Sequence, residues 1–458
     1  MIHLFDTLNG EIRPLNQRDE GCVSLYACGP TVYDHPHLGH ARQAMTYDVL
    51  RRYLEWRGVT VHHVANITDI DDKIIARAQR EGTTEEAIAT EWKTVYDQIM
   101  DRLSILRPHD RPHATGYIDE MVAFIQTLLD NGSAYANDSG VYLRVHRVEG
   151  YGDLVHRSLD DLRDGAGARV EVDPNKEDPL DFALWKAAKP DEPTWPAPWG
   201  AGRPGWHIEC VAMSLGILGD GFDLHGGGSD LVFPHHTNER AEALAAGRSF
   251  AQHWVHNAMV NIGGEKMSKS LGNYTTVEAL LDEHRDNARA LRLALLQTHY
   301  RKTMEINPEV MAQARAGLER LDAMGRKAVA AGVPTDASER DAPAVTAFVG
   351  AMDNDLGTPE AIATVFETIR RANGALDAGS EEAAVLVATA LDLAGALGLF
   401  LETTGRDGTD RTIDDLVAAR TQARTDRDFA EADRIRDQLT ELGVVVEDTP
   451  NGPIWHRS

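Results

Sequence analysis

The chain has 458 residues, of which 42% are hydrophobic and 26% charged, and its formal net charge is −26. Such a composition is typical of a soluble globular protein with two to four domains. No apolar stretch is long enough to span a membrane, and three cysteines are too few for a disulfide framework. We therefore expect a cytoplasmic protein without a membrane partner. The acidic balance does not decide against a nucleic-acid partner, because local basic clusters can bind a specific one.

The first hundred residues alternate between strand and helix patterns. A strand is predicted over 23–26, a helix ending at Trp56, a second strand over 59–66 and a helical run from Asp72. This strand–helix–strand order predicts a parallel sheet with crossover helices.

The first predicted strand and helix are joined by residues 28–40, which read CGPTVYDHPHLGH. Backbone N–H groups at the start of a helix form a phosphate site. His37 and His40 lie at this start, and Gly39 leaves room for a nucleotide near the backbone. An ordinary polar turn between strand and helix is the alternative interpretation.

The pattern changes between residues 108 and 200. A helix is predicted over 118–129, then a hairpin at SGVYLRV and a loop rich in Gly and Asp over 160–168. A segment rich in Pro and Trp follows. We expect this region to be an insertion in the sheet domain.

The rest of the chain is mostly helical in pattern. A helix starts at Asn307-Pro308, and others are predicted over 345–352, 359–373 and 381–400. The last segment, from residue 413, is predicted to form two helices, a strand over 444–447 and a turn before Ile454-Trp455.

A glycine-flanked basic segment, GGEKMSKSLGN, contains Lys266, Ser268 and Lys269. Alternating lysines and serines suit a triphosphate, because the ammonium groups neutralise oxygens while the hydroxyls orient them. An ordinary solvated basic loop is the alternative interpretation. The five residues KMSKS would occur by chance in very few chains of this length, so the segment is a specific signal.

Four residues form a candidate zinc set. His235 and Glu239 are four residues apart and share one face if they lie on a helix. Cys210 lies upstream in GWHIEC, and Cys28 lies far upstream, just after the first predicted strand. Two thiolates, an imidazole and a carboxylate suit zinc. Core cysteines and a surface His/Glu pair are the alternative interpretation.

Together these segments resemble the cysteinyl-tRNA synthetases, a family of class I aminoacyl-tRNA synthetases. His37–His40 matches the HIGH element of that family with leucine in second place, and Lys266–Ser270 matches its KMSKS loop without change. The similarity extends through NITDIDDKI, GRPGWHIEC, DLHGGGSDLVFPHH and LGVVVEDTPNG, so it covers nearly the whole chain.

The resemblance implies an α/β fold. A Rossmann-type parallel-sheet catalytic domain with an insertion would precede an α-helical bundle and a small mixed α/β C-terminal domain. The expected segments are 1–107 and 201–245 for the two catalytic halves, 108–200 for the insertion, 246–305 for the stem-contact region, 306–402 for the bundle and 411–458 for the anticodon-binding domain.

The resemblance also implies an activity, the joining of L-cysteine to tRNA(Cys) by a monomeric enzyme with Mg²⁺-ATP. His37 and His40 would stabilise charge on the α-phosphate, and Lys266 and Lys269 would stabilise the departing pyrophosphate. The other ATP contacts would be Thr31, Gly39 and Ser268.

By the same resemblance, one Zn²⁺ per chain would select the substrate thiolate over serine. Its ligands would be Cys28, Cys210, His235 and Glu239. Thr68, Trp206 and His207 would contact the amino acid. His225 and His236 would either orient the ligands or be ordinary core residues.

Some features of the chain leave alternatives open. Thr237 replaces a glutamate that is frequent in the family, and Arg434, Arg436 and Trp455 could contact an anticodon or belong to amphipathic helices. A ligase joining cysteine to an amino-sugar, of the mycothiol type, would use the same core but lack the C-terminal domain. A non-catalytic paralogue that binds tRNA or metal is the third candidate, against which the intact motif lysines and histidines argue.

Overall fold

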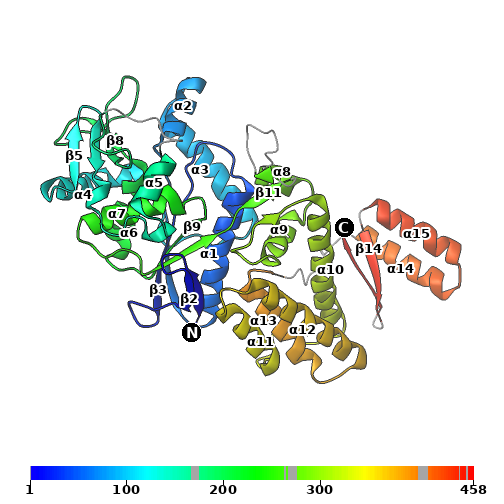
Figure 1. Cartoon of the computed structure of the whole chain (residues 1–458). Coiled ribbons are helices and arrows are strands. Elements are labelled where there is room, and N and C mark those ends of the chain that lie inside the picture. Colours follow the sequence, from blue (N-terminus) through cyan, green and yellow to red (C-terminus); the bar gives the residue numbers. More distant parts are fainter. Residues whose placement is uncertain are drawn as a thin grey trace. The chain divides into compact units, whose positions relative to one another are not determined.

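The computed structural model divides the chain into two compact units (Figure 1). The first unit comprises residues 1–311 and 352–357, and the second comprises 312–351 and 358–458. The structure describes residues 2–166, 175–262, 265–266, 276–400, 411–442, 444–449 and 452–457. Within these ranges, no helix combines the length and apolar composition that a bilayer crossing needs.

The first unit is built on a four-stranded parallel sheet, which confirms the predicted α/β class. Its strand order is β10 (His253–Asn257), β9 (Leu224–Gly228), β3 (Cys22–Ala27) and β4 (Thr60–Ala65). The helix α1 (Leu38–Trp56) makes the crossover from β3 to β4. Parallel neighbours require such a crossover.

Helices cover both faces of this sheet. Tyr47 of α1 donates hydrogen bonds to the carbonyls of Gly227 and Val255, on the face where Gly226 points. A Cβ on Gly226 would lie 2.2 Å from the Tyr47 ring, so only glycine allows α1 this close. Tyr26, one residue out of phase, packs on the opposite face with α6 (Trp206–Leu218).

The predicted helical run from Asp72 is two helices, α2 (Asp72–Glu81) and α3 (Glu85–Arg102). Gly82 ends α2 in the left-handed conformation, with φ +66°. The Thr84 side chain then accepts a hydrogen bond from Ala87 N and starts α3. The two helices pack against each other as a pair (Figure 1).

Residues 108–200, the predicted insertion, contribute three strands to a separate antiparallel sheet, whose fourth strand lies just past the predicted end of the insertion. A helix α4 (Ile118–Asp130) precedes strands in the order β5 (Ala134–Asn137), β6 (Gly140–Leu143), β7 (Phe182–Ala187) and β8 (Gly202–Pro204). The loop predicted over 160–168 is wrong for its first part, because residues Leu159–Ala166 form α5. Ser158 and Asp161 cap this helix reciprocally through N···O hydrogen bonds of 3.2 Å, a signal that outweighs the nearby glycine.

The remaining elements of the first unit are short. They are β1 (His3–Asp6), β2 (Glu11–Pro14), η1 (Ala114–Tyr117), η2 (Val145–Arg147), η3 (Asp153–Val155), η4 (Val232–His236), α7 (Thr237–Ala245), β11 (Val260–Ile262), β12 (Glu265–Lys266), α8 (Val277–Asp282), α9 (Asn287–Leu296) and β13 (Met304–Glu305).

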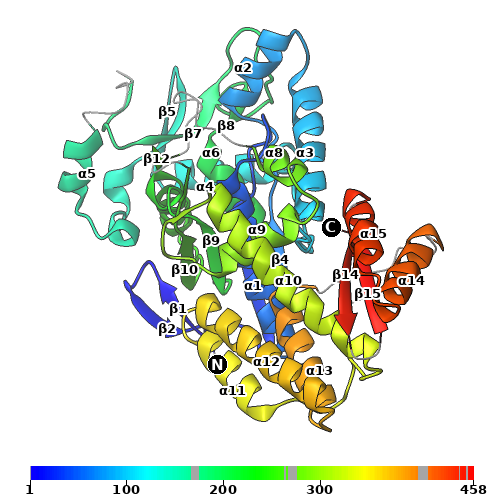
Figure 2. The same ribbon diagram turned by 90° about the vertical axis from the view of Figure 1, so that its right-hand side faces the viewer.

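The second unit is helical, as the sequence predicted, and ends in a hairpin of which only the first strand was predicted. Its α14 (Arg411–Thr425) and α15 (Phe429–Glu441) pack against the hairpin of β14 (Val444–Thr449) and β15 (Gly452–Arg457) (Figure 2). The helices before them are α10 (Pro308–Ala330), which begins in the first unit, α11 (Ala342–Asp353), α12 (Thr358–Ala378) and α13 (Ala383–Ala396).

Candidate catalytic and metal site

The two motif histidines are built into the start of α1. His37 Nδ1 accepts hydrogen bonds from the backbone N–H groups of Gly39 and His40, at 3.1 and 3.4 Å. The His37 N–H in turn donates to His40 Nδ1 at 3.2 Å, which completes a reciprocal capping box. The two rings stack with centroids 3.8 Å apart. The cap therefore fixes the rotamers of both side chains.

This arrangement sets the protonation of the pair. Burial lowers the pKa of His40 well below its usual value, and the positive charges of His37 and Lys73 lower it further. In both histidines Nδ1 accepts a hydrogen bond, so a neutral ring carries its proton on Nε2. The pair can therefore donate hydrogen bonds to an oxyanion.

A cavity of about 270 Å³ opens beside this cap at the carboxyl ends of the sheet strands. In open α/β sheets, ligands bind at this edge. Thr31, His37, Gly39 and His40 line the cavity, as the sequence placed them around ATP. Its wall also includes Cys28, Asn66, Lys73, Trp206, Gly228, Asp230 and Asn257.

The structure brings Cys28, Cys210, His235 and Glu239 to one buried point. One ligand atom from each lies within 4.8 Å of all the others. The Cys28 and Cys210 sulfurs are 3.7 Å apart, Cys28 Sγ is 3.6 Å from Glu239 Oε1, and Cys210 Sγ is 3.6 Å from His235 Nε2. Ligand atoms around tetrahedral zinc, at bond lengths of about 2.0–2.3 Å, lie about 3.3–3.8 Å from one another. The donor set and these three spacings fit zinc.

The four side chains come from three places in the fold. Cys28 directly follows β3, and Cys210 lies in α6. His235 and Glu239 flank the join between η4 and α7, where His235 Nε2 lies 2.9 Å from Glu239 Oε1. All four are at most 4% exposed. Their charges are therefore not screened by solvent.

The electrostatics within the cluster favour anionic oxygen and sulfur. Burial raises the pKa of Glu239, but the charges of His235 and His225 outweigh it and hold that pKa well below its usual value. A hydrogen bond from Cys28 lowers the pKa of Cys210 to about 6. Burial raises the pKa of Cys28. A buried carboxylate and a thiol poised to ionise are what a divalent cation requires.

Three further histidines support these side chains. His225 Nε2 lies 2.7 Å from Glu239 Oε2, and His236 Nε2 lies 3.3 Å from Cys28 Sγ. His236 Nδ1 lies 2.8 Å from His256 Nε2, and Thr7 Oγ1 lies 2.7 Å from His256 Nδ1. Contacts of this kind orient metal ligands. Sequence reasoning left His225 and His236 undecided and missed His256 and Thr7.

Of the three residues expected to contact the amino acid, only one lines the cavity. Trp206 lines the cavity, is 37% exposed and stacks on His235 with ring centroids 4.0 Å apart. His207 lies behind it, with Nδ1 2.8 Å from His235 Nδ1. Thr68 is buried, and its hydroxyl accepts a hydrogen bond from the Asn66 side chain. Asn66, to which the sequence assigned no specific role, lines the cavity, and its side-chain oxygen accepts a hydrogen bond from Gly29 N at 2.8 Å.

Part of the predicted ATP site cannot be compared with the structure. Ser268 and Lys269 lie outside the described residues, and Lys266 is described only by its backbone in β12.

The three residues predicted to meet an anticodon all lie in the C-terminal part of the second unit. Arg434 and Arg436 are exposed on α15 and pair with acidic neighbours, Arg434 with Glu431 and Arg436 with Asp433. Trp455 is only 5% exposed and packs in a hydrophobic cluster. The other buried members of this cluster are Ile413, Val417, Ile435, Leu439 and Val444. The burial of Trp455 favours a packing role over base stacking.

Comparisons with known proteins agree along the whole chain. Residues 14–316 match the family described as the tRNA synthetases class I (C) catalytic domain. Residues 347–402 match the DALR domain, and 406–455 match the cysteinyl-tRNA ligase anticodon binding domain.

Relatives and solved structures extend this similarity. A cysteine–tRNA ligase from Alkalilimnicola ehrlichii is 47% identical over 472 residues and one from Synechococcus elongatus is 46% identical over 486, each alignment covering all of both chains. The methionyl-tRNA synthetase of Mycobacterium tuberculosis, solved with methionyl-adenylate, has a TM-score of 0.58 at 15% identity over 82% of this chain and 90% of its own. That likeness shows a shared fold. Identity near one half over full length shows more: this chain belongs to the cysteine–tRNA ligase family of class I aminoacyl-tRNA synthetases.

Proposed function

We propose that the chain joins L-cysteine to tRNA(Cys) through a cysteinyl-adenylate. The cysteine carboxylate attacks the α-phosphate of Mg²⁺-ATP, a new P–O bond forms, and the bond to the β-phosphate breaks to release pyrophosphate. The terminal ribose hydroxyl of the tRNA then attacks the activated carbonyl. This hydroxyl loses its proton as AMP leaves.

One observation carries this proposal. A cluster of four ligand-type side chains and a pair of capped histidines meet around one cavity, with Cys28 both in the cluster and on the cavity wall. The cluster provides a place for sulfur, and the cap provides N–H donors for phosphate. Cysteine activation requires both within reach of one small molecule.

His37 and His40 act on the phosphate in this mechanism. Each would donate from Nε2 to α-phosphate oxygens as negative charge develops there. The capping box holds both rings in place before the substrate arrives, so little reorganisation is needed during the reaction. Lys266 and Lys269 are assigned to the departing pyrophosphate on the strength of their motif alone.

Selection against serine is assigned to the cluster of Cys28, Cys210, His235 and Glu239. An apolar pocket separates such similar substrates poorly, by about 1–3 kcal/mol for a one-group difference. Zinc held by these four residues would supply a soft Lewis acid that prefers a thiolate to a hydroxyl. Trp206, stacked on His235, would close the cavity over the side chain of the substrate.

The other segments receive roles by the same proposal. We assign 1–107 and 201–245 to catalysis, 108–200 to the insertion, 246–305 to the acceptor stem, 306–402 to the bundle and 411–458 to the anticodon. The match of 406–455 to an anticodon binding domain favours tRNA over an amino-sugar as the acceptor. Arg434 and Arg436 are the exposed cations on α15 for this role.

The test is aminoacylation of bulk tRNA with cysteine and with serine, using protein of measured zinc content. We expect charging with cysteine only. Cys210→Ser is expected to lower both the zinc content and the discrimination against serine. Cys22→Ser is the matched control, because Cys22 lies at the far end of β3 from the cluster. Full zinc content in Cys210→Ser would remove Cys210 from the site, and a wild-type chain that does not charge tRNA with cysteine would refute the function.

A further inference from the structure

A third lysine, outside the KMSKS motif, lines the nucleotide cavity. Lys73 is the second residue of α2, and its backbone N–H donates to the capping side chain of Asp71 at 2.9 Å. Its ammonium lies 5.1 Å from the centroid of the Tyr33 ring. Its positive charge also contributes to the lowered pKa of His40. Lys73, Tyr33 and the histidine pair line the same cavity, and Tyr33 lies in the loop that leads to that pair.

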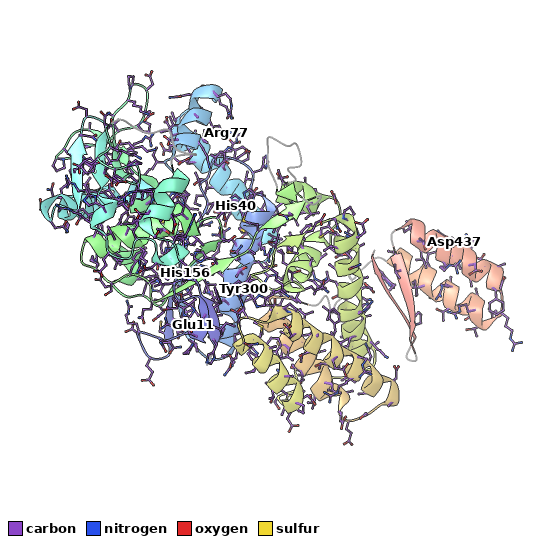
Figure 3. All side chains as sticks on the ribbon, in the orientation of Figure 1. Glu11, His40, Arg77, His156, Tyr300 and Asp437 are labelled. Atoms are coloured by element: carbon purple, nitrogen blue, oxygen red, sulfur yellow. The ribbon has the colours of Figure 1, made fainter. Side chains whose placement is uncertain are left out.

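The helix that carries Lys73 is fastened to the loop that carries the histidines. The Arg77 guanidinium donates to the Tyr33 carbonyl at 2.6 Å, pairs with Asp34 at 3.1 Å and stacks on Trp92 at 4.2 Å. Figure 3 labels Arg77 on α2 and His40 on α1. Because Arg77 lies one turn after Lys73, these contacts fix the base of the Lys73 side chain relative to the cap.

The charge of Lys73 is not neutralised by the protein. Within the described parts of the chain, no carboxylate lies at ion-pair distance from Lys73, although the neighbouring cations all have such partners. Arg77 pairs with Asp34 and Glu81, and Lys93 of α3 pairs with Asp97. Asp72, next to Lys73, is engaged by Lys186 and Arg203 instead. In a chain with a net charge of −26, an unpaired ammonium on a cavity wall suits an anionic ligand.

We propose that Lys73 binds a phosphate oxygen of a substrate at the β4 end of the cavity, an inference that rests on the proposed function. Two phosphates are available, that of ATP and that of the 3′-terminal nucleotide of tRNA.

The topology favours the tRNA phosphate. Gly228, Asp230 and Asn257 line the cavity from the ends of β9 and β10, and the chain continues from β10 into β11 and β12, where Lys266 lies. Lys73 lies on α2, which follows β4 in the chain, and β4 lies on the other side of β3 from β9 and β10. Lysines on opposite sides of the α-phosphate would thus bind the pyrophosphate and the 3′ end of the tRNA.

The test separates the two chemical steps. Lys73→Met, Lys73→Arg and wild type are compared in ATP–pyrophosphate exchange without tRNA and in single-turnover transfer from preformed cysteinyl-adenylate to tRNA. The control is Lys93→Met, which removes the same charge from α3 and leaves Asp97 paired with Arg107 and Arg111. Circular dichroism and zinc content verify that each variant is folded.

For a tRNA phosphate, we expect Lys73→Met to slow transfer by about 10- to 100-fold, the size of one charge-assisted hydrogen bond, with exchange nearly unchanged. The slope of log K against log salt for tRNA binding should become shallower by about 0.7, the value for one phosphate of a single strand. Lys73→Arg should retain most of the activity. A loss already present in exchange would also support the phosphate site and would assign it to ATP.

The inference is overturned if Lys73→Met matches wild type in both assays, or if Lys93→Met shows the same losses. Failure of the proposed function would look different, because the wild-type chain, measured in the same assays, would then not charge tRNA with cysteine.

Discussion

Replacing Gly39 with alanine should separate the proposed catalytic role of the histidine cap from its structural role. Gly39 has an ordinary backbone conformation, so alanine is not strained there by its φ. A Cβ at this position would lie 2.8 Å from His37 Cε1 and 2.9 Å from His37 Nδ1. The methyl group therefore displaces the His37 ring from its hydrogen bonds and from its stack on His40.

Two opposing terms set the change in stability. Loss of a helix cap costs about 0.5–2 kcal/mol. Alanine in place of glycine within a helix contributes about 1 kcal/mol in the other direction. The net change should stay within about 1 kcal/mol. Activity should change much more, because loss of a single preorganised donor to an oxyanion costs about 10²-fold or more in rate.

The assays are ATP–pyrophosphate exchange, thermal unfolding and hydrogen exchange of the peptide that contains the Gly39 and His40 amides. We expect exchange activity to fall about 10²-fold, the unfolding midpoint to move little, and these two amides to lose protection. Gly374→Ala is the matched control, since Gly374 lies exposed in α12 and a Cβ added there would meet no atom within 4 Å. It should raise stability slightly and leave exchange activity unchanged.

Full activity in Gly39→Ala, together with lost protection of the two amides, would refute the reasoning. It would mean that His37 acts without the cap. Full activity with protected amides would instead mean that the ring accommodates the methyl group, and the close contact would then not explain the glycine.

Two further predictions concern stability. Burial raises the pKa of Asp48, but the charges of Arg292 and Arg52 outweigh this effect and hold that pKa below its usual value. The ionised carboxylate therefore stabilises the fold above about pH 4. This contribution is lost as the pH falls through the lowered pKa. Asp48→Asn should cost about 3 kcal/mol at pH 7 and make thermal unfolding less sensitive to acid; an unchanged midpoint at pH 7 would contradict this. Trp455→Ala should cost about 3–5 kcal/mol, with faster hydrogen exchange in residues 411–457 and unchanged ATP–pyrophosphate exchange. Reduced tRNA charging with unchanged hydrogen exchange would instead favour base stacking.

The sheet was predictable where its strands are locally ordinary. Residues 23–26 form an alternating, mostly apolar run that is followed by a clear helical pattern, so β3, α1 and β4 could be predicted in order. The strands β9 and β10 read LHGGG and HWVHN, and neither was predicted as a strand. Glycine has low strand propensity, and here it is required by the approach of Tyr47, a tertiary contact that local patterns do not reveal.

The candidate site also contains residues that could be predicted from the sequence and residues that could not. Residue types and spacing offered Cys28, Cys210, His235 and Glu239 as a candidate zinc set but left core cysteines and a surface His/Glu pair as an alternative. The family resemblance gave these distant residues one shared role. His256 and Thr7 carry no such signal, since they matter only through a chain of contacts that ends at Cys28. For Trp455 the sequence suggested a contact that the burial of its side chain does not favour. The sequence of an aromatic residue near arginines is the same whether its side chain is exposed or buried.

The hydrogen bonds of the cap also limit what the histidine pair can do with charge. Because Nδ1 of His37 and of His40 already accepts from the backbone, a ring gains a second N–H only by giving up its part in the cap. The lowered pKa of His40 opposes that protonation as well. The pair therefore offers directed donors without a permanent positive charge. In the proposed reaction, neutralising the phosphates would fall to Mg²⁺ and to lysines, and this gives the ammonium of Lys73, on the wall of the same cavity, its proposed role.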